Sequence, residues 1–175
     1  MIRMDMEIFG EHYFTSKVDI TDPCYDKGTW CRKTVNVVEG NYDLCYTMAD
    51  EGAWGNRVAK IAIFHKDYSM DIINAKLIGE IGVDAGLAGF FNDKKDYTDA
   101  EWSEFCHNID GKDLIEIDNG FFSSSGYGDG MYDVYAYYND NNEIVGLEII
   151  FIEEGDEDDW GEEEEEGIEE DEDEI

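Results

Sequence analysis

The sequence predicts a mainly β protein of the α+β class, an antiparallel sandwich or curled sheet with one α-helix. Two observations carry this prediction. Apolar and polar residues alternate along most of the chain, which is the two-residue period of a β-strand. One segment instead has the start signal and the spacing of a helix. Because 42% of the 175 residues are apolar, the chain can build one domain with a substantial core.

The expected strands follow from this alternation. Asn56–His65 carries apolar residues on both faces, which is typical of a central strand. Lys76–Asp84 and Gly86–Phe91 are interrupted by glycines, which indicates bulges or close approach of neighbouring backbones. Further strands are expected at His12–Ile20, Lys33–Val38, Tyr42–Met48 and Asp113–Asp118.

The best-defined local units are a hairpin and a helix. Met131–Tyr138 and Glu143–Ile152 are joined by the turn residues Asn139–Asn142, which predicts an antiparallel hairpin. The helix is expected over residues 98–109, because Thr98 and Glu101 have the spacing of a capping box. The helical spacing and the end signal are carried by Trp102, Phe105, Cys106, Ile109, Asp110 and Gly111.

The negative charge is extreme and unevenly placed. The formal net charge is −33, and residues 153–175 hold 17 acidic residues and no lysine or arginine. Subtracting those 17 from the 45 acidic residues leaves 28 against 12 basic ones, a net charge of −16 for residues 1–152. We therefore expect a single β-rich domain over residues 1–152 and an acidic, disordered tail over residues 153–175.

This charge disfavours some partners and favours others. Direct binding to nucleic acid or to an anionic membrane is disfavoured, because phosphate contacts require lysine and arginine. A protein partner with a basic surface is expected instead. The tail residues expected to contact that partner are Trp160, Glu162, Glu163 and Glu164.

The expected location is the cytoplasm, or the host-cell cytoplasm if a phage encodes the protein. No apolar run approaches the roughly 20 residues that cross a bilayer, and the first residues lack the pattern of a signal peptide. The four cysteines, Cys24, Cys31, Cys45 and Cys106, show no zinc-knuckle spacing. They are expected to be free, mostly buried thiols, and the sequence does not indicate an oligomeric state.

Strand-end aspartates are the candidate metal ligands. Asp22, Asp84 and Asp129 each lie beside a glycine or proline where a strand ends. Carboxylate oxygens are the ligands that Ca²⁺ and Mg²⁺ prefer, so these two ions are the cofactors to consider. The alternative is that each aspartate caps a turn, and then no cofactor is needed.

A glycine-rich segment, "SSGYGDGMY", precedes the predicted hairpin. Alternating glycines allow positive φ, and consecutive N–H groups can then form a nest that binds a small anion. A phosphate loop would add a lysine and a following helix, whereas here a strand follows, so a tight turn is the competing interpretation. The candidate ligand-binding residues are Ser124, Gly126, Gly128, Asp129 and Gly130.

A nucleophilic site is a further alternative. Catalysis of this kind needs a nucleophile, a base and an orienting group. Cys24 and His12 flank the same predicted strand and turn, so they are the pair that the sequence offers.

Several stretches occur in an order that is shared with a known family. They are "DITDP", "VVEGNYDL", "NRVAKIAI", "IGVDAGLAGFF" and "SSGYGDGMYDVYAYYNDNNEIVGLEIIF", between Ser16 and Ile152. Here the chain resembles the bacterial and phage family catalogued as domain of unknown function 4241, which shows a D-P step, a V-D-x-G step and a terminal S-G-x-G-D-G-x-Y hairpin. Ala85 departs from it, since such proteins often carry serine there. The resemblance implies no particular activity.

Two functions of different classes follow from these observations. The first is a non-enzymatic acidic binding protein, an inhibitor or immunity-like protein that engages a basic, nucleic-acid-binding protein. The alternative is a metal-dependent enzyme or a small-anion-binding module built on the strand-end aspartates and the glycine-rich segment.

Overall fold

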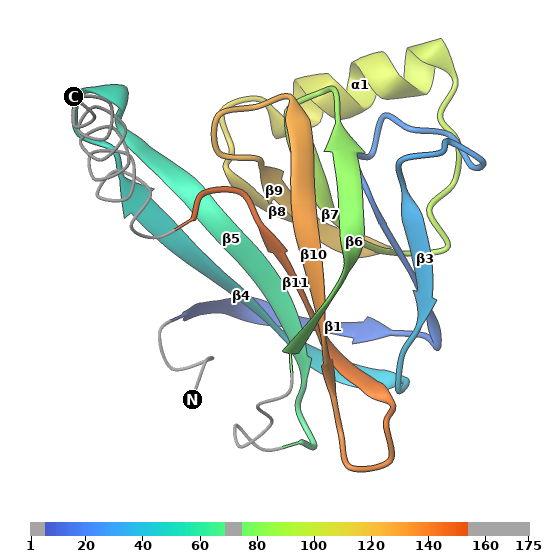
Figure 1. The fold of residues 1–175 in the computed structure, drawn as a ribbon. Coiled ribbons are helices and arrows are strands. Elements are labelled where there is room, and N and C mark those ends of the chain that lie inside the picture. The colour runs from blue at the N-terminus through green and yellow to red at the C-terminus, as the bar shows by residue number, and fades with distance from the viewer. Residues whose placement is uncertain (1–5, 69–74, 154–175) are drawn as a thin grey trace, which may run out of the picture.

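A computed structural model of the chain describes residues 6–68 and 75–153, which form two antiparallel sheets and one α-helix (Figure 1). The strands are β1 (Glu7–Phe14), β2 (Lys17–Thr21), β3 (Lys33–Asn36), β4 (Gly40–Asp50), β5 (Asn56–His65), β6 (Ala75–Val83), β7 (Leu87–Asn92), β8 (Leu114–Ile117), β9 (Gly120–Ser124), β10 (Gly130–Tyr138) and β11 (Ile144–Ile150). The helix α1 spans Asp99–Ile109, and a single 3₁₀ turn covers Gly52–Trp54. The mainly β class with one helix is therefore confirmed.

The two sheets enclose the main core. The six-stranded sheet has the order β1-β4-β5-β11-β10-β6, and the five-stranded sheet has the order β3-β2-β7-β9-β8. Alternate residues of both sheets point into the space between them, and Phe90 and Phe121 are examples from the five-stranded sheet. Their neighbours Phe91 and Phe122 point to the opposite face, where Phe105 of α1 packs against them. Helix α1 therefore covers the β7-β9-β8 part of that outer face.

The expected strand His12–Ile20 is wrong in one respect, because it is two strands in different sheets. The chain crosses between the sheets at Thr15 and Ser16, and the Thr15 amide donates to Asn92 Oδ1 at 2.8 Å. The buried residues Phe14 and Val18 stand four positions apart, which is a spacing that a single strand would also give, so their spacing carries no sign of the crossing.

A second difference is strand β9, which lies just before the glycine-rich segment, where the sequence predicts no strand. Its residues Phe121 and Phe122 are adjacent and both buried, one on each face of the sheet, so they show no alternation. The other expected strands and the hairpin at Asn139–Asn142 are present, with ends shifted by a few residues.

The helix begins as the sequence predicts. The Thr98 hydroxyl accepts from the Glu101 amide at 3.1 Å, and the Thr98 amide donates to Glu101 Oε1 at 2.9 Å. The helix ends at Ile109, and Gly111 follows with a φ of 81°. No helix within residues 6–68 and 75–153 is both long enough and apolar enough to span a bilayer. All four cysteines are free thiols, as expected.

The glycines inside the strands mark close backbone approach, as predicted. Gly89 of β7 pairs with Phe122 of β9, and a Cβ at Gly89 would overlap the Phe121 carbonyl oxygen. Gly79 of β6 has a φ of 136° and lies where the register of β6 against β10 shifts, which is a bulge.

Replacing Gly89 by alanine should destabilise the domain by roughly 3 kcal/mol, because the added methyl has no space between β7 and β9. Gly10→Ala is the matched control, since Gly10 also lies in a strand and its nearest neighbour would be Glu116 Oε1 at 3.8 Å. Denaturant midpoints of both variants measure the effect. An unchanged midpoint for Gly89→Ala would contradict the close approach of the two strands.

Candidate interaction site at the loop end

Three segments that the sequence singled out meet at one end of the sandwich. The Asp22 carboxylate accepts from the amides of Asp84 and Ala85, at 2.8 and 2.6 Å. The Ser125 amide donates to the Gly86 carbonyl at 3.1 Å, which joins the third segment to the other two. We call the surface formed by residues 22–32, 50–57, 84–87 and 125–131 the loop end; its segments lie toward the top of Figure 1.

Asp22 has a structural task within this cluster. Its side chain is fully buried, and Oδ1 accepts from the Cys24 amide at 2.8 Å while Oδ2 takes the two amides of the β6–β7 turn. Asp-Pro begins a turn at this point, so the carboxylate can bond to the backbone two residues on and also reach across to the next segment. Both oxygens are therefore occupied by backbone donors.

The other two candidate metal ligands are placed differently. Asp84 meets Asp22 through its backbone amide, and the side chains of Asp84 and Asp129 lie exposed. Within residues 6–68 and 75–153, no group of three or more His, Cys, Asp or Glu side chains is arranged to hold a metal ion. A calcium or magnesium site at these aspartates stays a prediction.

The glycine-rich segment is an ordered turn. Gly126 and Gly128 have φ angles of 67° and 107°, as their alternation predicts. The Ser125 hydroxyl donates to the Gly128 carbonyl at 2.9 Å, and the Tyr132 hydroxyl donates to the same oxygen at 2.6 Å. Ser125 and Tyr132, rather than the exposed Asp129, thus cap this turn.

Two further candidate ligand-binding residues lie at the edges of that turn. Gly130 is the first residue of β10 and pairs with Val83 of β6, so it belongs to the sheet. The Ser124 hydroxyl donates to Asp113 Oδ1 at 3.3 Å, and its amide donates to the Asp113 carbonyl. Ser124 is therefore bonded to the residue before β8, whereas its neighbour Ser125 takes part in the turn itself.

Arg57 links the turn at residues 125–128, which we call the glycine turn, to the β4–β5 hairpin. Its Nη1 donates to the Gly126 carbonyl at 3.0 Å, and its guanidinium lies 4.4 Å from the centre of the Tyr127 ring. The Tyr127 hydroxyl donates to Glu51 Oε1 at 2.7 Å. Tyr127 is held on two sides and is still 52% exposed, and Trp54 in the adjoining 3₁₀ turn is 69% exposed.

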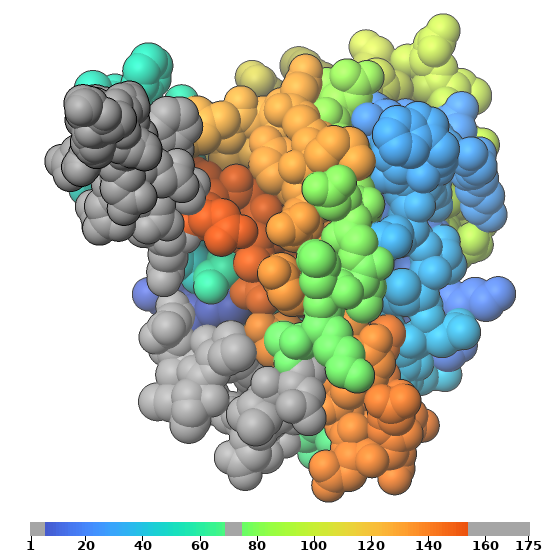
Figure 2. All heavy atoms as spheres, viewed as in Figure 1, coloured from blue at the N-terminus to red at the C-terminus, as the bar shows by residue number. Residues whose placement is uncertain are grey.

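A second pair of exposed apolar side chains lies at the loop end. Trp30 is 83% exposed and Met131 is 45% exposed. Gly82 joins the strand that begins near Met131 to the loop that contains Trp30. It pairs with Met131 in the β6–β10 ladder, and its amide donates to the carbonyl of Cys31, the residue after Trp30, at 2.9 Å. Figure 2 shows the start of β10 and the loop before β3 along the upper edge of one face of the molecule.

The expected pair of Cys24 and His12 is not formed. His12 Nδ1 lies 2.7 Å from Glu116 Oε2 on β8, so the ring is bonded elsewhere. Burial raises the pKa of the Cys24 thiol to about 12, and the neighbouring Asp22 and Asp84 carboxylates act in the same direction. The thiol is therefore protonated at neutral pH, and a protonated thiol is a poor nucleophile.

Sequence reasoning missed the residues that shape this surface, which are Glu51, Trp54, Arg57 and Tyr127. A signal was present for Trp54, because it stands in a short turn between Gly52 and Gly55 that joins two strands. For Arg57 and Tyr127, no local pattern indicates that a strand residue meets a loop 69 positions away. The expected tail contacts, Trp160 and Glu162–Glu164, lie outside the described residues.

The fold and this site define an acidic antiparallel β-sandwich with aromatic side chains exposed at one end. No family model, curated protein or solved structure matches the chain. The resemblance to domain of unknown function 4241 stays a prediction.

Gly128→Ala should destabilise the protein by roughly 1 kcal/mol, because an L-residue at a φ of 107° is strained even though the space around it is open. Gly126→Ala should cost more, since its Cβ would also lie 3.1 Å from the Phe151 Cβ. Thermal melting of both variants measures this order. Unchanged melting for both would show that the turn does not depend on its glycines.

Millimolar Ca²⁺ or Mg²⁺ should produce no saturable rise in the melting temperature. The reason is that both Asp22 oxygens already accept hydrogen bonds from backbone amides. Of the three candidate metal ligands, only Asp84 and Asp129 then remain available. The titration uses a chain ending at Ile152, because the acidic tail binds cations loosely, with NaCl at matched ionic strength as control. A saturable shift that Asp129→Asn abolishes would overturn this expectation.

Proposed function

We propose that this protein is a non-enzymatic acidic binding protein, an inhibitor or immunity-like protein whose partner presents a basic protein surface. The observation that supports it best is the aromatic pair Trp54 and Tyr127, which stays exposed at the loop end of an acidic domain. The two parts of this argument, exposed aromatics and charge, are independent of one another.

The aromatic part rests on order as well as exposure. Tyr127 is restrained by the Arg57 guanidinium on its ring and by Glu51 at its hydroxyl. A side chain that is already fixed loses little conformational entropy on binding. Tryptophan, tyrosine and arginine are the residues on which the affinity of protein interfaces most often depends. Trp54, Tyr127 and Arg57 supply one of each at the loop end.

The electrostatic part concerns the kind of partner. Residues 1–152 have a net charge of −16, and the exposed side chains of Asp50, Asp84 and Asp129 belong to the loop end. Carboxylates steer a cationic surface toward this side of the molecule and raise the association rate, with an effect that falls as salt increases. Exposed aromatic faces also attract arginine and lysine side chains by cation–π interaction. A basic surface rich in arginine is thus the partner that this combination suits.

The tail extends the same electrostatic argument along the chain. The tail has 17 acidic residues in 23 positions, so it is densely charged and has the same negative sign as a nucleic-acid strand. A basic protein that normally binds nucleic acid would be attracted to both the domain and the tail. The alternative function, a metal-dependent enzyme or small-anion module at the strand-end aspartates, is tested by the cation titration above.

Trp54→Ala and Tyr127→Ala should each weaken the complex with a basic partner at least tenfold, roughly the loss of one central interface side chain. The partner is recovered from a host lysate at low salt, eluted at high salt, and its binding to purified variants is measured by surface plasmon resonance. Tyr13→Ala is the matched control, because Tyr13 is 49% exposed and lies on β1, outside the loop end.

A chain ending at Ile152 forms the second arm of that experiment. It should keep its melting transition and associate more slowly at low salt, because it has lost 17 of the attracting charges. Equal losses for Tyr13→Ala and Tyr127→Ala would place the interface elsewhere. Association of the truncated chain at the full rate in low salt would remove the tail from the mechanism.

A further inference from the structure

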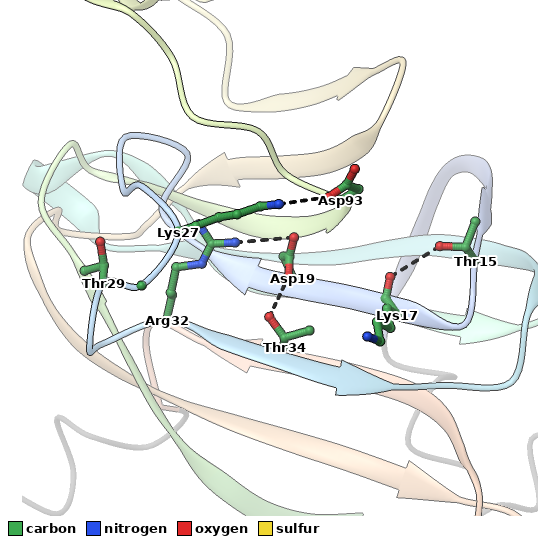
Figure 3. A pocket seen from close by; sticks show the side chains of 9 residues that line it. Thr15, Lys17, Asp19, Lys27, Thr29, Arg32, Thr34 and Asp93 are labelled. Atoms are coloured by element: carbon green, nitrogen blue, oxygen red, sulfur yellow. Dashed lines mark hydrogen bonds and ion pairs between the residues drawn. The ribbon is translucent and has the colours of Figure 1, made fainter.

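A cleft opens on the part of the five-stranded sheet that α1 leaves uncovered. It has a volume of about 540 Å³ and lies between the outer face of β2 and β3 and the loop before β3 (Figure 3). Polar side chains dominate its lining, among them Lys17, Asp19, Lys27, Arg32, Thr34 and Asp93. This volume falls in the range of small-molecule sites in proteins.

The floor of the cleft is a buried ion pair. Asp19 is buried and accepts from the Thr34 hydroxyl at 2.6 Å and from the Lys94 amide at 2.7 Å. Arg32 Nη2 lies 3.3 Å from Asp19 Oδ2, and both side chains are nearly inaccessible to solvent. The guanidinium is therefore held rigidly, with N–H groups beyond those that this pair uses.

A second cation lies directly behind Arg32. Arg32 Nη1 and Lys94 Nζ both donate to the Tyr25 carbonyl, at 3.2 and 3.4 Å. Lys94 is 1% exposed, and its ammonium also donates to the Lys95 carbonyl and lies 4.5 Å from the centre of the Tyr97 ring. Burial and the nearby Arg32 lower the pKa of Lys94, while the exposed Asp26 and Asp96 act in the opposite direction.

The rim adds two more cations. Lys17 begins β2 and is exposed, and the Lys27 side chain is 59% exposed with its ammonium 3.3 Å from Asp93. Asp93 also accepts from Lys95 at 3.0 Å, so one carboxylate is shared by two lysines. Three of the 12 basic residues of this acidic chain thus line one cleft, and one of them, Arg32, shares a carbonyl acceptor with the buried Lys94.

We infer that the cleft is a binding site for a small molecule that carries an oxyanion, a carboxylate or phosphate group, held by Lys17, Lys27 and Arg32. Arginine and lysine form the strongest hydrogen bonds with such groups, because both partners are charged. The negative charge of distant parts of the chain opposes binding only weakly, since screening limits it to about 8 Å at physiological ionic strength. This inference does not rest on the proposed protein partner, because Trp54 and Tyr127 do not line the cleft, although segment 22–32 borders both the cleft and the loop end.

The test uses the full chain with two probes, inorganic phosphate and succinate, each compared with NaCl at equal ionic strength. A ligand that binds only the folded state raises the melting temperature in a saturable way. We expect such a rise with one probe or both, and which probe acts distinguishes a phosphate from a carboxylate ligand. In ¹⁵N–¹H spectra, the amide signals of Gly28, Thr29 and Thr34 should shift along the same titration.

Three glutamine variants locate the effect. Lys17→Gln and Lys27→Gln remove exposed ammonium groups at the rim, and Asp93 keeps Lys95 as a partner in the second case. Each should weaken the apparent Kd at least about tenfold, which is close to the lower end of the range for one charged hydrogen bond. Lys112→Gln makes the same charge change at an exposed position after α1 and should leave the Kd unchanged. A response that is absent for both probes, equal in all three variants, or confined to amides outside the cleft would overturn the inference.

Discussion

The organisation of the loop end depends on one buried carboxylate. Asp22 lies at the end of β2 and accepts three backbone amides, one from its own turn and two from the turn between β6 and β7. Because hydrogen bonds to a charged group contribute about 1.5–3 kcal/mol each, this side chain can hold the end of β2 firmly against the turn that leads from one sheet to the other. The glycine turn is attached to the β6–β7 turn in its own right, through the hydrogen bond from the Ser125 amide to the Gly86 carbonyl.

The segment from Asp22 to Arg32 connects the two surfaces to which functions are assigned. At one side, Trp30 belongs to the exposed apolar side chains of the loop end. At the other side, Lys27 and Arg32 border the cleft. Between them, the Tyr25 carbonyl accepts from both Arg32 and Lys94, which orients the cations toward the sheet. Two of the few basic residues of this acidic chain are thus held together at the cleft by one backbone acceptor.

The sequence predicted the elements whose information is local. Strand β5 has the predicted bounds, and the capping box at Thr98 and the hairpin at Asn139–Asn142 form as expected, because each depends on neighbouring residues alone. The crossing at Thr15–Ser16 and strand β9 were not predicted. In the first case the buried residues Phe14 and Val18 keep the even spacing of a single strand across the crossing. In the second, two adjacent phenylalanines are buried on opposite faces, so no alternation exists to be seen.

The sequence by itself determined the fold class, the charge, the cap of α1 and the positive φ angles of the glycine-rich segment at Gly126 and Gly128. These follow from residue type and from spacings of a few positions. Only the tertiary structure decided that Asp22 serves backbone amides, that Arg57 meets Tyr127, and that Arg32 and Lys94 meet at one carbonyl. Arg32 and Tyr25 stand 7 positions apart, Asp22 and Ala85 stand 63 apart, and Lys94 and Tyr25 stand 69 apart. Electrostatic and hydrogen-bond energies depend on distance through space, which the path of the whole chain determines.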